Sequence, residues 1–131
     1  MKKKNILFVC KYNRFRSKIA EACFKKFNKN KNFQGKSAGI IKGRPLNKSQ
    51  QALAKKLKIV IKGPTQGLSS KLLRGSDIIV IVADDVPKEV FKFQGKYLQK
   101  IIVWKIEDKN SSIELIIKKV KDLINKLEKQ K

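Results

Sequence analysis

Apolar residues along the chain gather in short runs separated by amphipathic stretches. Residues 6–9, 78–82 and 101–104 are apolar without polar alternation, which is typical of strands buried on both faces of a sheet. Residues 33–38, closed by Gly39, are a fourth and weaker strand candidate. Residues 59–61 are apolar and β-branched, but Gly63 and Pro64 end the run, which predicts a strand fragment or a buried loop.

Helical spacing of apolar residues marks the segments between these runs. In residues 17–29, Ile19, Cys23 and Phe27 recur four apart and define one helix face. A second helix is expected after a cap at Asn47 or Ser49, and a third over residues 68–73, which stops near Gly75. A brief fourth helix begins at Pro87, and the final helix follows the capping-box pattern of Ser111 and Glu114.

The resulting order, β-α-β-α-α-β-α-β-α, indicates an α/β fold. We expect a four-stranded parallel sheet, doubly wound as in flavodoxin-like proteins, with helices on both faces. Residues 1–131 form a single domain by length. Such sheets bind ligands outside the carboxyl ends of their strands, where the turns after residues 10, 38, 82 and 104 lie.

Charge is the strongest compositional feature, with a formal net charge of +23. Such a balance indicates either contact with nucleic acid or anionic surfaces, or a solvated basic shell. Lysines scattered through every element favour the shell, and nucleic-acid binding stays as the alternative. The chain has no histidine, which excludes imidazole bases and ligands. Two cysteines, no secretory signal and no membrane-length apolar run lead us to expect a cytoplasmic protein.

The segment with candidate chemistry joins the first strand to the first helix. The strand ends at Cys10, and Arg16 and Ser17 follow after five intervening residues. Backbone N–H groups of a tight strand-to-helix loop converge on an anion and favour the thiolate, the nucleophilic form of cysteine. The cysteine–arginine spacing alone is a weak motif, but the preceding strand and following helix make coincidence much less probable.

Each member of this loop has a chemical task. Cys10 would attack phosphorus and form a cysteinyl-phosphate, and Arg16 would hold two phosphoryl oxygens with its planar fork. Ser17 would donate a hydrogen bond to the thiolate or cap the helix. The residues expected to bind substrate are Lys11, Tyr12, Asn13, Arg14, Phe15, Arg16 and Ser17.

A phosphate ester also needs a proton for its leaving oxygen. Asp108 follows the last strand at the same sheet edge, directly before the capped helix. Asp84, Asp85 and Glu107 compete for the role, so the chemistry alone favours Asp108 only modestly.

These residues resemble the low-molecular-weight protein tyrosine phosphatase family over essentially the whole chain. The family's cysteine-x5-arginine-serine motif matches residues 10–17, and its Ala-Glu-Ala helix core matches residues 20–22. Its Ser-Ala-Gly turn matches residues 37–39, and its tryptophan-to-aspartate run matches residues 104–108. The resemblance implies phosphorylated proteins or small aryl phosphates as substrates, a phosphate or sulfate ion in the loop, Asp108 as general acid, and no cofactor or metal.

Several positions depart from the family pattern. Tyr12 stands where the family usually has glycine, and Phe15 replaces a second loop cysteine, so no disulfide within the loop can protect the nucleophile. The residue after the implied acid is Lys109 rather than proline. Asn13 keeps the family's asparagine, and Ser37 is its expected hydrogen-bonding partner.

Two alternatives remain open from the sequence. An arsenate-reductase-like enzyme would use the same loop, but a thiol relay needs further cysteines, and none follows Cys23. Cys23 itself is expected to be an inert core residue. The second alternative is a non-enzymatic, basic nucleic-acid-binding protein on this scaffold.

Overall fold

Four parallel strands form the single sheet of this computed structural model, which describes residues 4–13, 15–41, 48–59, 66–87, 100–107, 109 and 111–129. The strands are β1 (Lys4–Cys10), β2 (Phe33–Gly39), β3 (Ile78–Val82) and β4 (Lys100–Trp104), in the order β2-β1-β3-β4. All three neighbouring pairs are parallel, as the near-continuous apolar runs predict. The expected four-stranded α/β architecture is therefore confirmed.

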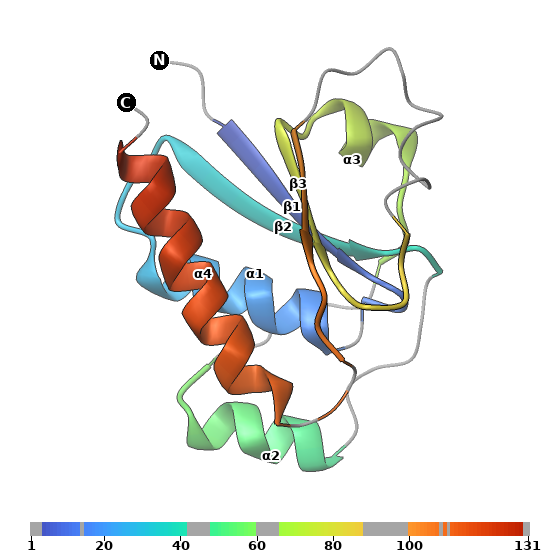
Figure 1. Cartoon of the computed structure of the whole chain (residues 1–131), viewed down its shortest axis with the longest axis vertical. Helices are drawn as coiled ribbons and strands as arrows, with labels where there is room; N and C mark the ends of the chain where they lie inside the picture. The colour runs from blue at the N-terminus through green and yellow to red at the C-terminus, as the bar shows by residue number, and fades with distance from the viewer. Residues whose placement is uncertain are drawn as a thin grey trace.

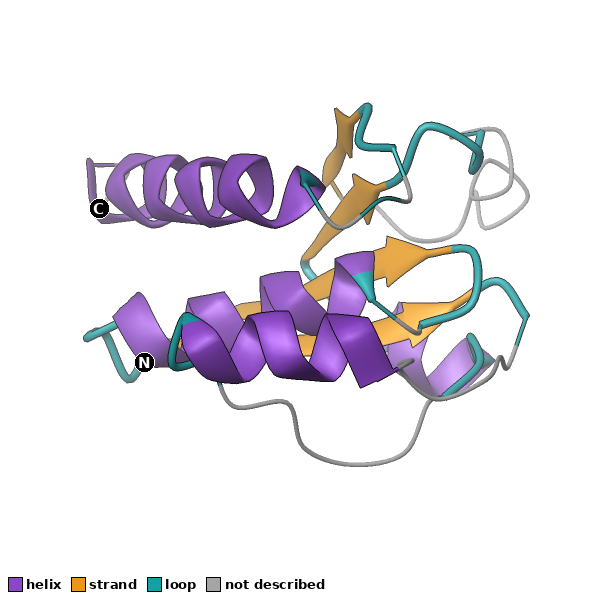
Figure 2. Ribbon diagram, turned by 90° about the horizontal axis from the view of Figure 1, so that it is seen from below, coloured by secondary structure: helices purple, strands orange, loops and turns teal. Residues whose placement is uncertain are grey.

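Helices cover both faces of this sheet. The helices are α1 (Arg16–Phe27), α2 (Lys48–Lys56), α3 (Ser70–Arg74) and α4 (Ser112–Lys129). Phe8 of β1 faces the larger core with residues of α1, α2 and α4, whereas its neighbour Val9 faces the smaller core with Leu73 of α3. The pleat of β1 thus alternates its side chains between the two cores. Figures 1 and 2 show the helices on either side of the sheet.

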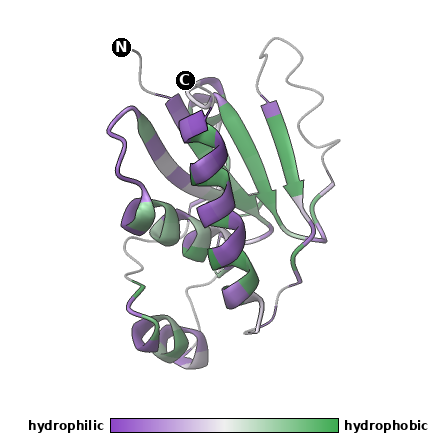
Figure 3. Ribbon diagram, turned by 60° about the vertical axis from the view of Figure 1, so that its left-hand side comes forward, coloured by the Kyte–Doolittle hydropathy of each residue, from purple (hydrophilic) through white to green (hydrophobic). Residues whose placement is uncertain are grey.

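The amphipathic pattern of α4 explains its position along the sheet. Its buried residues recur three or four apart, among them Ile116, Val120 and Leu127, whereas the residues between them are mostly exposed and charged. Figure 3 shows this alternation on α4 beside the largely hydrophobic strands. Among the described residues, no helix combines the length and the apolar composition that crossing a membrane requires.

The strand register brings the expected ligand-binding edge together. Cys10 pairs with Gly39, the last residue of β2, and Val82 pairs with Trp104, the last residue of β4. The strand ends that lead into the candidate site are therefore neighbours at one edge of the sheet.

Element boundaries differ from the expectations by a few residues. α1 begins at Arg16 and ends at Phe27, and α4 begins at Ser112, directly after the predicted cap Ser111. α3 begins at Ser70, and Ser69 caps it by accepting a hydrogen bond from the Leu72 amide. The brief helix expected from Pro87 onward falls mainly on residues 88–99, outside the described residues, as do Asn47, residues 60–61, Arg14 and Asp108.

Candidate active site

The loop between β1 and α1 holds the Cys10 thiol beside the first turn of the helix. Cys10 is buried, and its Sγ lies 3.0 Å from the Ser17 Oγ. The Asn13 side-chain amide donates to the same oxygen at 2.8 Å. Because Ser17 accepts that bond, its own hydroxyl hydrogen is available to donate to sulfur. Phe15, not Ser17, occupies the N-cap position of α1, so the capping alternative for Ser17 is not observed.

Asn13 fixes the shape of the loop. Its φ of 53° lies in the left-handed region, which asparagine tolerates better than most residues. Its side-chain oxygen accepts a hydrogen bond from the Gln66 backbone N–H at 2.8 Å, and the Gln66 side chain donates to the Ser37 carbonyl at 2.6 Å. The expected hydrogen bond between Asn13 and Ser37 is wrong, because the Ser37 hydroxyl donates to Glu21 at 2.5 Å instead.

The loop is also packed directly against the end of β2. Ile40 and Ile41 donate backbone hydrogen bonds to the carbonyls of Cys10 and Lys11. A Cβ added to Gly39 would lie 2.6 Å from backbone atoms of both Tyr12 and Asn13. Glycine is thus required here for close approach of two backbone segments.

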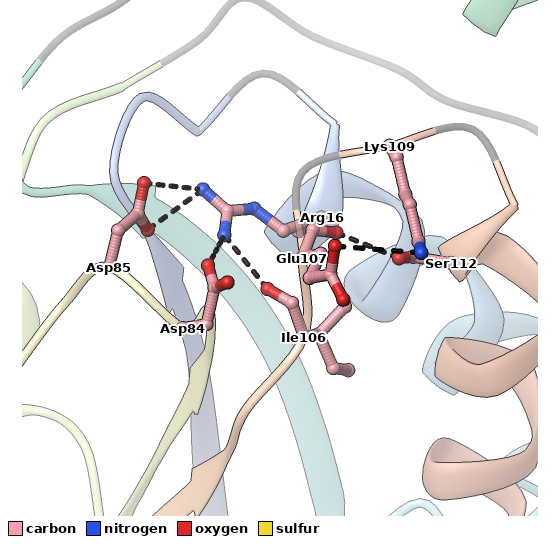
Figure 4. Close-up of polar contacts among 7 residues, drawn as sticks. All are labelled: Arg16, Asp84, Asp85, Ile106, Glu107, Lys109 and Ser112. Atoms are coloured by element: carbon pink, nitrogen blue, oxygen red, sulfur yellow. Dashed lines mark hydrogen bonds and ion pairs between the residues drawn. The ribbon is translucent and has the colours of Figure 1, made fainter.

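Arg16 is the most deeply embedded charge of the site. Its guanidinium is 2% exposed, and its NH1 donates to the Ile106 carbonyl at 2.9 Å and to Asp84 at 3.3 Å. Its NH2 lies 3.0 Å from a carboxylate oxygen of Asp85. Both carboxylates are partly exposed, at 43% and 42%. Figure 4 shows the guanidinium between the two aspartates and the segment that follows β4.

A count of donors shows what Arg16 has left to offer. A guanidinium has five N–H groups, and the contacts with described residues involve NH1, which faces Asp84 and the Ile106 carbonyl, and NH2, which faces both carboxylate oxygens of Asp85. None of these contacts uses Nε. In an arginine, Nε–H and one NH2 hydrogen point in the same direction and suit two oxygens of a phosphoryl group. Among the described contacts, the aspartates therefore orient the guanidinium through NH1 and NH2 and leave Nε unused.

The segment after β4 forms the third wall of the site. The Asp84 backbone N–H donates to the Ile106 carbonyl at 3.0 Å, which ties the loops after β3 and β4 together. Glu107 and Lys109 form an ion pair at 3.5 Å, and the Ser112 hydroxyl donates to the Glu107 carbonyl (Figure 4). Asp108, the expected acid, lies outside the described residues between them.

Two further ionisable residues of α1 lie close to the loop in sequence. Cys23 is fully buried, and this burial raises the pKa of its thiol to about 11, so it stays protonated at neutral pH. Burial also lowers the pKa of the Lys18 ammonium. The expectation that Cys23 is a core residue is confirmed. The described residues contain no group of three side chains suited to hold a metal ion.

Three partners of the site could not be assigned from the sequence. Asp84 and Asp85 were expected only as competing acids, yet they bind Arg16. Gln66 lies 53 residues from Asn13 and carries no local signal, since it binds through its backbone N–H. The only sequence clue to Asp84 and Asp85 is their position directly after the β3 strand, at the same sheet edge as Cys10.

The fold and this loop define a class: a parallel sheet with helices on both faces, in which a cysteine ends the first strand and an arginine begins the helix that follows. A sequence profile of the family described as low molecular weight phosphotyrosine protein phosphatase matches residues 5–130. The chain belongs to this family. A search of curated proteins found no match.

Solved structures give the same fold at low identity. A low molecular weight protein tyrosine phosphatase from Streptococcus pyogenes is 21% identical with a TM-score of 0.81, over 95% of this chain and 93% of that one. The YwlE arginine phosphatase from Geobacillus stearothermophilus is 17% identical with a TM-score of 0.77, over 97% of this chain and 92% of that one. A thioredoxin-dependent arsenate reductase from Corynebacterium glutamicum is 18% identical with a TM-score of 0.78 and covers all of this chain, which spans 64% of that protein.

Proposed function

We propose that this chain is a phosphomonoesterase that hydrolyses aryl phosphates, phosphotyrosine among them, through Cys10. The observation that carries the proposal is a buried thiol with a hydroxyl hydrogen bond at 3.0 Å, in a loop that ends at an oriented arginine. A thiolate beside converging N–H groups is the arrangement that nucleophilic phosphoryl transfer needs.

The proposed reaction has two displacement steps. In the first, the Cys10 thiolate forms an S–P bond, the P–O bond of the ester breaks, and Asp108 gives its proton to the leaving oxygen. In the second, water attacks phosphorus, Asp108 takes a proton from it, and the S–P bond breaks to release phosphate and the thiolate. Arg16 and the amides of residues 11–16 stabilise the charge on the transferring group in both steps. Ser17 stabilises the departing thiolate, and Ser37 supports the loop through Glu21 and Gln66.

Turnover of p-nitrophenyl phosphate by the wild type, Cys10→Ser and Asp108→Asn tests the assignment. We expect Cys10→Ser to lose activity completely and Asp108→Asn to lose roughly 10²- to 10⁴-fold, as is typical for a general acid. Hydrolysis by Cys10→Ser at the wild-type rate would refute the proposal. An unimpaired Asp108→Asn would move the acid to Glu107, because Asp84 and Asp85 are engaged with Arg16. Phosphotyrosine peptides and phosphoarginine as parallel substrates would establish specificity.

Arsenate reduction is the weaker candidate. It shares the anion-binding loop, but a thiol relay needs a second reactive cysteine. The other cysteine of this chain, Cys23, is buried, and the raised pKa of its thiol keeps it protonated. Cys23 therefore does not supply the second thiolate that a relay within this chain would need.

A further inference from the structure

Two lysine ammonium groups share one aromatic ring on the side of the molecule where α1 packs against α4, and the backbone of a third lysine lies beside them. Lys26 belongs to α1, Lys58 follows the end of α2, and Lys121 belongs to α4; we call them the lysine cluster. The Lys26 ammonium donates to the Lys58 carbonyl at 3.1 Å. The Lys26 and Lys121 ammonium groups lie 5.4 and 4.5 Å from the centroid of the Phe27 ring. All three lysines are exposed.

No carboxylate neutralises this cluster within the described part of the chain. The ion pairs there involve Arg16, Lys25 and Lys109, and none involves a member of the cluster. The Lys26 and Lys121 ammonium groups lie over the same ring, and like charges placed in this way repel one another, a repulsion that a bound anion would relieve. Both Lys26 and Lys121 also lower the pKa of the Cys23 thiol beneath them, against the effect of burial, which places both charges near one point.

A purely structural role explains only part of this arrangement. Lys26 binds a carbonyl close to the end of α2, where a cation complements the helix dipole. This interaction accounts for Lys26 but not for Lys121, which comes from another helix and shares the same aromatic ring. The cluster is also remote from the loop, because ten residues of α1 separate Arg16 from Lys26, a rise of about 15 Å. The end of α1 and the neighbouring part of α4 lie on the left-hand side of Figure 1, which is turned forward in Figure 3.

We propose that the lysine cluster binds the phosphate backbone of a nucleic acid without reading its base sequence. Lysine contacts phosphate as a point charge, and such contacts position a strand but carry no sequence information. Phe27 is half-buried under two ammonium groups, so its ring anchors the lysines rather than stacking on bases. The net charge of +23 adds a long-range field that raises the encounter rate with a polyanion.

A lipid surface fits these observations less well. Membrane binding of a basic patch is strengthened by apolar side chains that insert beside the charges. The exposed large hydrophobic residues of the described chain are Ile41, Val103 and Leu115, which lie after β2, in β4 and in the first turn of α4 rather than beside Lys26 and Lys121 in sequence.

Fluorescence anisotropy with a labelled single-stranded oligonucleotide of about 20 nucleotides tests this site. The variants are Lys26→Gln/Lys58→Gln/Lys121→Gln and a control with the same charge change at three other exposed lysines, Lys36→Gln/Lys71→Gln/Lys100→Gln. At about 50 mM salt we expect the cluster variant to bind at least about tenfold more weakly than the control. Its plot of log affinity against log salt should be shallower by about 2, because each single-strand phosphate contact contributes about 0.7.

Further arms separate this site from the phosphatase proposal and from misfolding. The three-arginine variant of the cluster should bind like the wild type, because it keeps the charges. Cys10→Ser should also bind like the wild type, whatever the outcome of the phosphatase assay. Equal losses in the cluster and control variants, or no binding at about 50 mM salt, would overturn the proposal. Binding to phosphatidylserine vesicles without binding to the oligonucleotide would overturn it in favour of a membrane partner.

Discussion

The two aspartates that hold Arg16 make a sharp prediction about stability. We consider the double variant Asp84→Asn/Asp85→Asn, which keeps the side-chain shapes and removes both negative charges. The guanidinium is only 2% exposed, so it would remain buried with the Ile106 carbonyl as its main described partner. An unpaired buried charge is strongly destabilising.

The size of the effect follows from the exposures of the partners. Breaking a fully buried ion pair costs about 3–5 kcal/mol, whereas exposed pairs contribute about 0–1 kcal/mol. The carboxylates are 43% and 42% exposed, so solvent screens them, and we expect a loss of about 2 kcal/mol for the double variant. With an unfolding entropy of about 2.1 cal/mol/K per residue, this lowers the Tm by about 7 °C.

Thermal unfolding with and without inorganic phosphate measures both the loss and its cause. Phosphate should stabilise the double variant more than the wild type, because it replaces the missing negative charge. The two carboxylates also no longer repel the anion, an effect of about 1 kcal/mol each for a dianion at roughly 7 Å in high dielectric. Asp122→Asn, an exposed charge on α4, is the matched control and should leave the Tm unchanged. A double variant that melts within about 1 °C of the wild type, or equal phosphate shifts in both, would refute this account of Arg16.

Three further predictions concern the loop and the core. Gly39→Ala should lower the Tm strongly and abolish phosphate binding, because the new Cβ would lie 2.6 Å from backbone atoms of the loop. The control Gly75→Ala, whose Cβ would lie 3.3 Å from its nearest contact, should lower the Tm only slightly in the same thermal-shift assay. Ser17→Ala should slow alkylation of Cys10 by iodoacetate several-fold, since it removes the hydrogen bond to sulfur; an unchanged rate would contradict the donor assignment. Burial raises the pKa of Cys23 from an ordinary value of 9.0 to about 11 in the folded state, so the unfolded state loses its proton first as the pH rises. The free energy of unfolding should therefore fall by roughly 2 kcal/mol between pH 9 and 11 in denaturant titrations, a fall that Cys23→Ala should lack.

The parts of this molecule that sequence could predict are those with local causes. Three of the four strands follow from apolar runs, and β2 is the weaker candidate that ends at Gly39. The contact between Cys10 and Ser17 follows from the short loop that joins β1 to α1. The partners of Arg16 could not be assigned, because 68 and 69 residues separate it from Asp84 and Asp85. Their meeting depends on β3 pairing directly with β1, which the apolar pattern does not determine.

The burial of Arg16 explains why a chain of net charge +23 places two carboxylates beside the loop proposed to bind phosphate. Without an anion, the buried guanidinium of Arg16 needs compensation, and Asp84 and Asp85 supply it from outside the loop. Because both aspartates are partly exposed, water can solvate them when a phosphoryl group takes over the neutralising role, so the exchange leaves no buried unpaired charge. The Nε–H, which none of the described contacts uses, is a donor that such a group can reach before either aspartate is displaced. The aspartates keep the arginine ready for an anion, and their exposure limits the free energy that the anion must supply to displace them.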